Sequence, residues 1–148
     1  MLLNSSTDLK RCNEAGYIAL HLAARSWRKE VVKLLLESDM NIETREDNGR
    51  TSLHYASSIE NEKSMTTLLN AKTNVMTKDK NEWTALHLTL ENDHIKMINK
   101  LLDEKTDIMT QSKNEWISLY LTSRNDYITM MSRLLNARAN VMTQNKNK

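Results

Sequence analysis

The 148-residue sequence contains no proline, no phenylalanine, only two glycines and a single cysteine. Because glycine and proline are the usual turn formers, other residue types must hold the turns of this chain. With Cys12 alone, no intrachain disulfide can form. This cysteine usage favours an intracellular, cytoplasmic location, where thiols stay reduced.

Long apolar runs and a strong excess of one charge are also missing. No apolar run approaches the roughly 18 residues of a membrane span, and the start of the chain lacks the apolar core of a signal peptide. The net charge of +2 and the pI of about 8.6 are too mild to indicate a nucleic-acid partner, which usually needs a clustered basic face. We therefore expect neither membrane insertion nor nucleic-acid binding.

The sequence does contain an internal repeat, because three landmarks recur at one constant spacing. The first begins as Ala19-Leu20-His21-Leu22 and returns at 52–55, 85–88 and 118–121. The second is an apolar pair at 35–36, 68–69, 101–102 and 134–135, and the third is a polar–aliphatic pair at 41–42, 74–75, 107–108 and 140–141. One period kept by three landmarks over four copies predicts a repeat protein.

Each copy predicts two short helices followed by an extended turn. In the first copy we expect helices over 19–26 and 30–37 and a turn over 40–50. The apolar stripe of the second helix would consist of Val31, Val32, Leu35 and Leu36. Neither helix is long enough to be stable alone in water, so each must bury its stripe against its partner and the next copy.

This pattern resembles the ankyrin repeat, a unit of about 33 residues with a Thr-Pro-Leu-His box at the start of its first helix. The corresponding boxes lie at 18–21, 51–54, 84–87 and 117–120, and all of them lack the proline. Gly16 and Gly49 match the turn glycine before the box, which Glu82 and Glu115 replace in later copies. The resemblance implies an all-α ankyrin-repeat solenoid of stacked helix-turn-helix pairs joined by extended, β-hairpin-like connections.

The repeat register also predicts how the chain is divided. It gives a remnant of a preceding repeat at 1–12, ankyrin repeats at 13–45, 46–78, 79–111 and 112–144, and the start of a further turn at 145–148. Natural arrays end in capping repeats with a polar outer face, and neither end resembles one. We expect a window of a longer array or a truncated product, the alternative being that short tails fold back as improvised caps.

The chain departs from the family where ankyrin repeats usually have glycine, between the two helices and again after the second. The first position holds Trp27, Glu60, Asp93 and Asp126, and the second holds Asp39, Lys72, Lys105 and Arg138. A left-handed backbone at these positions would cost roughly 1 kcal/mol for each non-glycine residue. The second helix also loses apolar character, since Leu34 is replaced in later copies by Thr67, Lys100 and Arg133. We expect lost packing there and an array that is strongest in its first repeat.

Three histidines at one repeat position, His21, His54 and His87, could suggest a metal cluster. Stacked helices lie about 8–10 Å apart, however, whereas one zinc ion needs each ligand nitrogen at about 2 Å. The resemblance implies instead a structural hydrogen-bonding role at the helix start, and a similar one for His94. The sequence has no nucleophile–base arrangement, phosphate loop or paired-cysteine motif, so we expect no metal, no cofactor and no enzymatic activity.

Methionine is frequent, with nine copies. Four of them lie on the second-helix stripe, namely Met65, Met97, Met130 and Met131, and are expected in the core. Three share one turn position and are expected to stack between neighbouring repeats, namely Met76, Met109 and Met142. A methionine-rich binding surface is the alternative.

The strongest surface signal is the position directly after the turn glycine position. It is occupied by Tyr17, Arg50, Trp83 and Trp116. In ankyrin repeats this position faces the concave groove, and tyrosine, tryptophan and arginine are enriched at binding hot spots. Further candidates are Asp47, Asn48, Lys80, Asn81, Lys113 and Asn114 on the turns, and Arg25, Ile59, Asn92 and Arg124 at the end of the first helix. The alternative is that the tryptophans only shield neighbouring turns.

These residues predict a scaffold or adaptor that binds another protein through its concave helix face and turn tips. Two other interpretations stay open at this point. The chain could be the targeting module of a larger enzyme or channel, or a decaying repeat fragment without a selected function. The missing glycines and prolines favour the decaying fragment somewhat.

Overall fold

The computed structural model describes residues 18–38, 40–104, 106, 112–113, 132 and 135–136. Within these ranges it contains six α-helices and no strands: α2 (Ala19–Arg25), α3 (Lys29–Glu37), α4 (Ser52–Ser58), α5 (Glu62–Asn70), α6 (Ala85–Glu91) and α7 (Ile95–Asp103). The two helices predicted for the first copy are therefore confirmed, with bounds that differ by one residue at one end of each.

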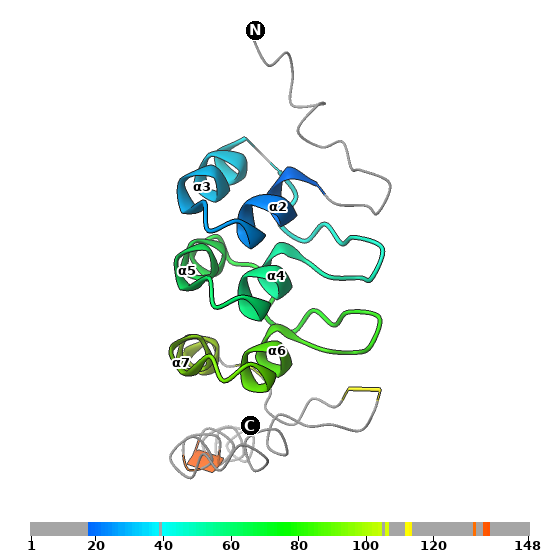
Figure 1. Ribbon diagram of the computed structural model, residues 1–148, viewed down its shortest axis with the longest axis vertical. Helices are drawn as coiled ribbons and strands as arrows, with labels where there is room; N and C mark the ends of the chain where they lie inside the picture. The colour runs from blue at the N-terminus through cyan, green and yellow to red at the C-terminus, as the bar shows by residue number, and fades with distance from the viewer. Residues whose placement is uncertain are drawn as a thin grey trace, which may run out of the picture.

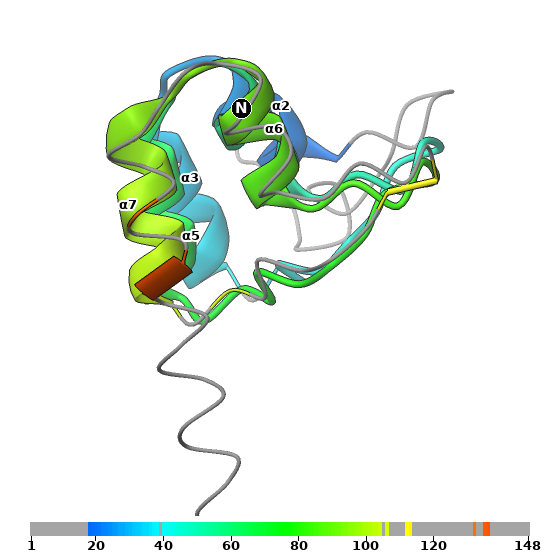
Figure 2. The ribbon, with the colours of Figure 1, turned by 90° about the horizontal axis from the view of Figure 1, so that it is seen from below.

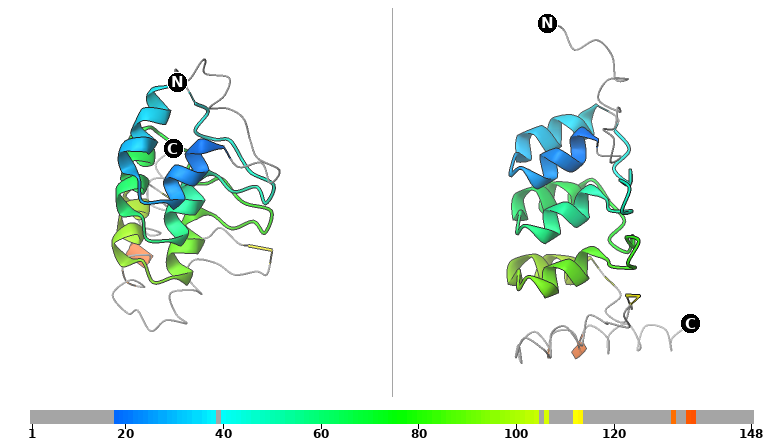
Figure 3. Two further views of the ribbon diagram at one scale, coloured as in Figure 1. Left: turned by 45° about the horizontal axis from the view of Figure 1, so that its top comes forward. Right: turned by 45° about the vertical axis from the view of Figure 1, so that its right-hand side comes forward.

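The helices are stacked as antiparallel pairs in two columns. Helices α2, α4 and α6 form one column and α3, α5 and α7 the other, while the connecting turns all project to the same side (Figure 1). Seen along the stack, the pairs superpose and the turns lie over one another (Figure 2). The side views show the turns leaving the helices at a steep angle (Figure 3). This arrangement is the predicted all-α solenoid.

The hydrophobic core runs through the stack between the two columns. Its largest fully buried apolar side chains are Leu20, Leu53, Met65, Leu68, Leu86, Met97, Ile98 and Leu101. Burial of each such side chain contributes about 1.5–3 kcal/mol relative to exposure, which the short helices need because they are unstable alone. The predicted core positions of Met65 and Met97 are confirmed.

Two predictions about the second helix are wrong. Val31 is 36% exposed, so the buried stripe of α3 consists of Val32 and Leu35, with Leu36 at its edge. Leu34 is 61% exposed, so this position belongs to the surface in the first pair. Its replacement by polar residues in α5 and α7 therefore removes no core side chain. Instead, Lys100 Nζ of α7 lies 3.6 Å from Glu62 Oε1 of α5, an ion pair between neighbouring pairs.

The backbone is left-handed at the positions where ankyrin repeats usually have glycine. Between the helices, φ is 59° at Trp27, 58° at Glu60 and 61° at Asp93, and after α5 it is 64° at Lys72. The condition on which the expected cost rests is therefore met at these four positions, while Asp39, Lys105, Asp126 and Arg138 lie outside the described residues. An L-residue in this conformation costs roughly 1–2 kcal/mol.

The backbone is also left-handed at the turn glycine position before the box. Gly49 has a φ of 76° and its replacement Glu82 has a φ of 61°. A Cβ added at Gly49 would lie 2.8 Å from a guanidinium nitrogen of Arg45 and 3.2 Å from the backbone nitrogen of Lys80. Glycine is therefore favoured at residue 49 by both backbone conformation and space, whereas one repeat later a glutamate holds the same left-handed conformation.

Candidate binding surface

The histidines of the box satisfy backbone groups at the start of each first helix. Nδ1 of His21, His54 and His87 accepts a hydrogen bond from the N–H of the residue before the helix, over 3.1, 3.2 and 3.2 Å to Ile18, Thr51 and Thr84. Because Nδ1 accepts, the proton is on Nε2, which can donate. In His21 it donates to the Thr44 carbonyl over 2.9 Å, and in His54 to the Trp83 carbonyl over 3.0 Å. Each of these two imidazoles thus fixes a projecting turn to a helix.

The environment keeps these imidazoles neutral. Burial is the largest effect and lowers the pKa of His21 and His54 below 6.5, although the carbonyl acceptors and the nearby Glu46 and Asp79 carboxylates oppose it. Neutral imidazole is the form that the observed acceptor role of Nδ1 requires. Among the described residues, no group of three or more His, Cys, Asp or Glu side chains could hold a metal ion.

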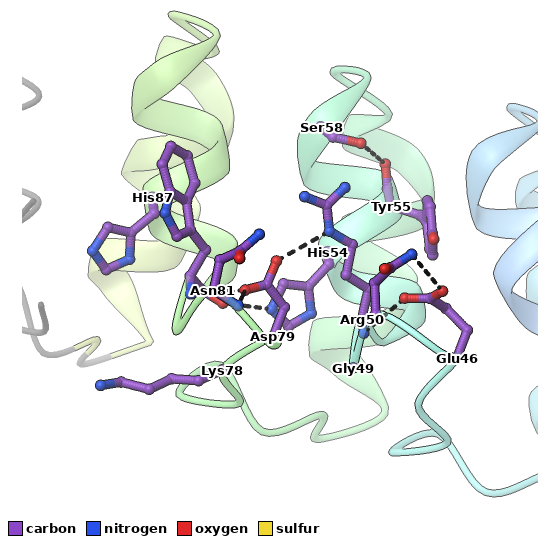
Figure 4. A network of polar contacts seen from close by, with 12 residues as sticks. Glu46, Gly49, Arg50, His54, Tyr55, Ser58, Lys78, Asp79, Asn81 and His87 are labelled. Carbon is purple, nitrogen blue, oxygen red and sulfur yellow. Dashed lines mark hydrogen bonds and ion pairs between the residues drawn. The ribbon is translucent and has the colours of Figure 1, made fainter. Parts of the chain in front are cut away.

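Buried carboxylates shape the tips of the turns. Glu46 and Asp79 occupy equivalent positions, and each is 4% exposed. Glu46 accepts hydrogen bonds from the backbone N–H of Arg50 over 3.0 Å and from the side-chain amide of Asn48 over 3.1 Å. Asp79 accepts from the N–H groups of Asn81 and Trp83 over 2.8 and 3.0 Å. Because a carboxylate satisfies the backbone donors inside each tip, the tips do not depend on proline or on a second glycine (Figure 4).

Neighbouring tips are bonded to one another. The Lys80 N–H donates to the Asn48 carbonyl over 2.9 Å, and the Lys113 N–H donates to the Asn81 carbonyl over 3.0 Å. This bond therefore repeats once per ankyrin-like unit. Figure 4 also shows the Arg50 Nε donating to the Asp79 carboxylate of the next tip, over 3.1 Å. We call this series of bonded tips, residues 45–50, 78–83 and 112–113, the tip ladder.

Glu43 adds a second connection at the base of the turns. Its carboxylate accepts from the Thr73 hydroxyl over 2.9 Å, the Asn74 N–H over 2.7 Å and the Thr77 hydroxyl over 3.2 Å. All three donors belong to the next turn along the chain. Sequence reasoning missed Glu43, Glu46 and Asp79, although the last two share one repeat position, which was a visible signal.

The predicted binding residues that the structure describes on the turns all lie on the tip ladder, but they differ in exposure. Those that the structure describes as exposed are Asp47, Asn48, Lys80, Asn81 and Lys113. Arg50 and Trp83 are half-buried. Arg50 is held by its ion pair with Asp79, and the Trp83 ring lies tilted against His87 with centroids 5.8 Å apart. Tyr17, Gly16, Asn114, Trp116 and Arg124 are outside the described residues.

The candidates at the end of the first helix do not form one row. Arg25 is the last residue of α2, whereas Ile59 and Asn92 are the residues that follow α4 and α6. All three described candidates thus lie at the end of the first helix, with Arg25 one position earlier in the repeat than Ile59 and Asn92. Arg25 and Asn92 are exposed, and Ile59 is half-buried.

Comparison with known families identifies this architecture. A family profile described as ankyrin repeats, three copies, matches residues 1–79 and again residues 60–145. The chain belongs to the ankyrin-repeat family. Ankyrin repeats are generally protein-interaction modules, and their fold is typically non-catalytic. A search of curated proteins found no match to this ankyrin chain. Over the described ranges, no helix has the length and apolar character to cross a membrane.

Proposed function

We propose that this ankyrin chain is an intracellular scaffold or adaptor that binds another protein through its turn tips and the adjoining face of α2, α4 and α6. The tip ladder is the observation that supports this proposal. Buried carboxylates and bonds between tips hold its backbone, so the positions from which the exposed side chains project are set before a partner arrives. Pre-ordered groups lose less conformational entropy on binding, which favours affinity. The chain acts without catalysis and without a cofactor.

Trp83 and Arg50 are the residues we expect to contribute most to affinity. Tryptophan and arginine dominate measured hot spots, because each combines a large contact area with a donor. Both are partly packed against the fold, so their side chains are oriented but still reachable. The exposed Lys80 and Asn81 beside Trp83 would form the polar rim of such a contact.

The test uses the parent protein and two variants as baits. Each bait captures binding proteins from cells that produce the parent, and the captured amounts are compared quantitatively. The tip variant carries Trp83→Ala and Lys80→Ala. The control carries Lys63→Ala and Lys96→Ala, which remove two exposed lysines from α5 and α7 on the opposite side of the pairs. Circular dichroism first verifies that both variants retain the helical signal of the parent.

A protein captured by the parent and the control, and reduced at least tenfold with the tip variant, is the expected result. Loss of the same protein with the control but not with the tip variant would assign binding to the second-helix side. Equal capture by all three folded proteins would show that the tips do not bind the partner. Either of these outcomes refutes the proposed surface.

A further inference from the structure

The first turn tip contains the one Asn-Gly pair of the sequence, Asn48-Gly49, on the tip ladder. Of the two glycines in the chain, Gly16 follows an alanine and Gly49 follows Asn48. The Asn48 side chain is exposed. Because glycine has no Cβ, its backbone nitrogen can approach the side-chain carbonyl carbon of the preceding asparagine, an approach that a larger residue obstructs.

The reaction open to this pair is the loss of the side-chain amide as ammonia. The Gly49 nitrogen gives up its proton and attacks Cγ of Asn48, so that a new C–N bond forms and the amide nitrogen leaves with that proton as ammonia. The resulting cyclic imide then takes up one water molecule. Water opens the ring at Cγ to give aspartate, or at the former backbone carbonyl carbon to give isoaspartate, whose main chain runs through Cβ and Cγ.

Glu46 holds both reacting groups of this pair in place. Its backbone carbonyl accepts the Gly49 N–H over 2.7 Å, so the attacking nitrogen keeps its proton. Its carboxylate accepts a hydrogen bond from the Asn48 side-chain amide over 3.1 Å, which fixes the group that would be attacked. The backbone N–H of Arg50 holds the same carboxylate over 3.0 Å (Figure 4). The reaction therefore requires a local opening of the tip that breaks these bonds.

The second tip has the same backbone but lacks the glycine. Asn81 is the equivalent of Asn48 and is also exposed, and the Glu82 N–H donates to the Asp79 carbonyl over 2.9 Å. Glu82 has a φ of 61°, close to the 76° of Gly49, but its side chain crowds its backbone nitrogen. Asn81 is therefore a matched asparagine within the same protein, and it should stay intact.

Either product places a third carboxylate on the first tip. Residue 48 would become an acid beside the exposed Asp47, and it would face the Glu46 carboxylate with no amide proton to donate. Like charges at this distance repel, the more strongly because Glu46 is buried. The isoaspartyl product also displaces the carbonyl that accepts the Lys80 N–H over 2.9 Å, because the main chain gains one carbon atom. Conversion should therefore break the bond between the first and second tips.

We propose that Asn48 is a self-modification site whose reaction is gated by the tip ladder. While Glu46 holds the first tip closed, the asparagine is retained. Each opening of the tip exposes Asn48 to attack by the Gly49 nitrogen, and the product keeps residues 45–50 detached from residues 78–83. The site thus converts tip opening into a lasting negative charge on this surface. It is independent of the function proposed for the tips, because no partner takes part in the reaction.

The experiment follows the conversion of Asn48 during incubation of the full chain at neutral pH in heavy-oxygen water. Each conversion takes up one oxygen atom from this water, so mass spectrometry of the peptides counts only conversions that occur during the incubation. The samples are the folded parent, the parent unfolded in guanidinium chloride, and the variant Glu46→Ala. The matched control Asp47→Ala removes the neighbouring exposed carboxylate. Circular dichroism verifies that both variants keep the helical signal of the parent.

Asn48 in the folded parent should convert more slowly than in the unfolded chain by about tenfold or more, and Asn81 should stay intact in both. Glu46→Ala should convert faster than the folded parent by about fivefold or more, whereas Asp47→Ala should keep the parent's rate. The comparison of folded and unfolded parent needs no variant, so a Glu46→Ala that fails to fold leaves the test intact.

The converted chain is then separated by ion exchange, through its added negative charge, for hydrogen exchange with deuterium. In the isoaspartyl form, the Lys80 N–H should exchange faster than in the parent, because its acceptor on residue 48 is displaced. The Trp83 N–H, which is bonded to Asp79 within the second tip, should keep its rate.

Four results would overturn the proposal. Equal conversion rates in the folded and unfolded parent would show that the ladder does not gate the reaction. An intact Asn48 in the folded parent, once the unfolded chain has converted completely, would show that the tip does not open to the reaction. A folded Glu46→Ala that converts at the parent's rate would show that Glu46 does not hold the tip closed. Unchanged exchange of the Lys80 N–H in the isoaspartyl form would show that the product does not detach the tips. None of these measurements involves a partner, so their outcome is separate from that of the binding test.

Discussion

Replacement of Glu60 by glycine should stabilise the protein, because Glu60 holds a left-handed backbone without compensation from its exposed side chain. Its φ of 58° is imposed by the tight turn between α4 and α5, where the Asn61 N–H donates to the Ala56 carbonyl over 3.0 Å. Release of the strain is worth roughly 1–2 kcal/mol. The greater freedom of glycine in the unfolded chain offsets about 0.5–1 kcal/mol of this gain.

The expected net gain is therefore about 0.5–1 kcal/mol for Glu60→Gly. Lys72→Gly at the end of α5, where φ is 64°, should give a similar gain. The two sites lie at opposite ends of α5, so their effects should add to about 1–2 kcal/mol. For a chain of this size, such a gain raises Tm by roughly 3–8 °C.

The assay is thermal and urea unfolding, followed by far-ultraviolet circular dichroism. Lys63→Gly is the matched control, since Lys63 is an exposed residue inside α5 and glycine there should cost about 1 kcal/mol. Opposite signs for the turn and the helix substitutions are expected. A destabilising Glu60→Gly of the same size as Lys63→Gly would refute the left-handed turn, and with it the way the two helices are joined.

Three further predictions follow from the polar groups. Asp79→Ala should cost about 2–4 kcal/mol in urea unfolding, because two tip N–H groups lose their acceptor, whereas Asp47→Ala on the exposed tip should change little. Ser64→Ala should stabilise by about 1 kcal/mol, since its buried hydroxyl has no hydrogen-bond partner among the described residues. A loss of stability would show that the hydroxyl is bonded. The pKa values of His21 and His54 are lowered on folding, so between the folded pKa and 6.5 the unfolded state binds more protons. Stability should thus be complete above pH 6.5 and fall as the pH drops below it, by up to about 1.4 kcal/mol per pH unit for each histidine; a urea midpoint that stays flat as the pH falls through this range would contradict this.

The repeat period made the helices and the left-handed positions predictable from the sequence. A position such as residue 60 is fixed by its register, because the turn between two antiparallel helices needs the same backbone conformation in every copy. The glutamate there does not change the geometry; it only makes it more costly. For this reason glycine-free turns at Trp27, Glu60 and Asp93 could be placed from the sequence.

The exposure of Val31 and Leu34 could not be predicted in the same way. The apolar character of these residues indicates a packed position, but burial also requires a neighbouring pair on that side. Among the described residues, α5 and α7 have a preceding helix pair on this side, whereas α3 does not. The exposure of Val31 and Leu34 is therefore a property of the stack, which no single repeat encodes.

The turn carboxylates were missed for a different physical reason. An acidic residue in a polar turn usually indicates a solvated surface, and Glu46 and Asp79 gave no local sign of burial. Their role depends on donors that arrive from the same tip and, through Arg50, from the neighbouring tip. The described tip residues Asp47, Asn48, Lys80, Asn81 and Lys113 do lie on the turns, but the carboxylates that support them were not foreseen.

The rigidity of the tip ladder is the central claim, and hydrogen exchange of its backbone amides tests it most directly. The Lys80 N–H, bonded to the Asn48 carbonyl, and the Trp83 N–H, bonded to Asp79, should exchange at least about 100-fold more slowly than in an unstructured peptide. Asp79→Ala should abolish the protection of Trp83. Exchange of both amides at the rate of a free peptide in the folded parent would show that the tips are not ordered, and the proposed binding surface would lose its physical basis.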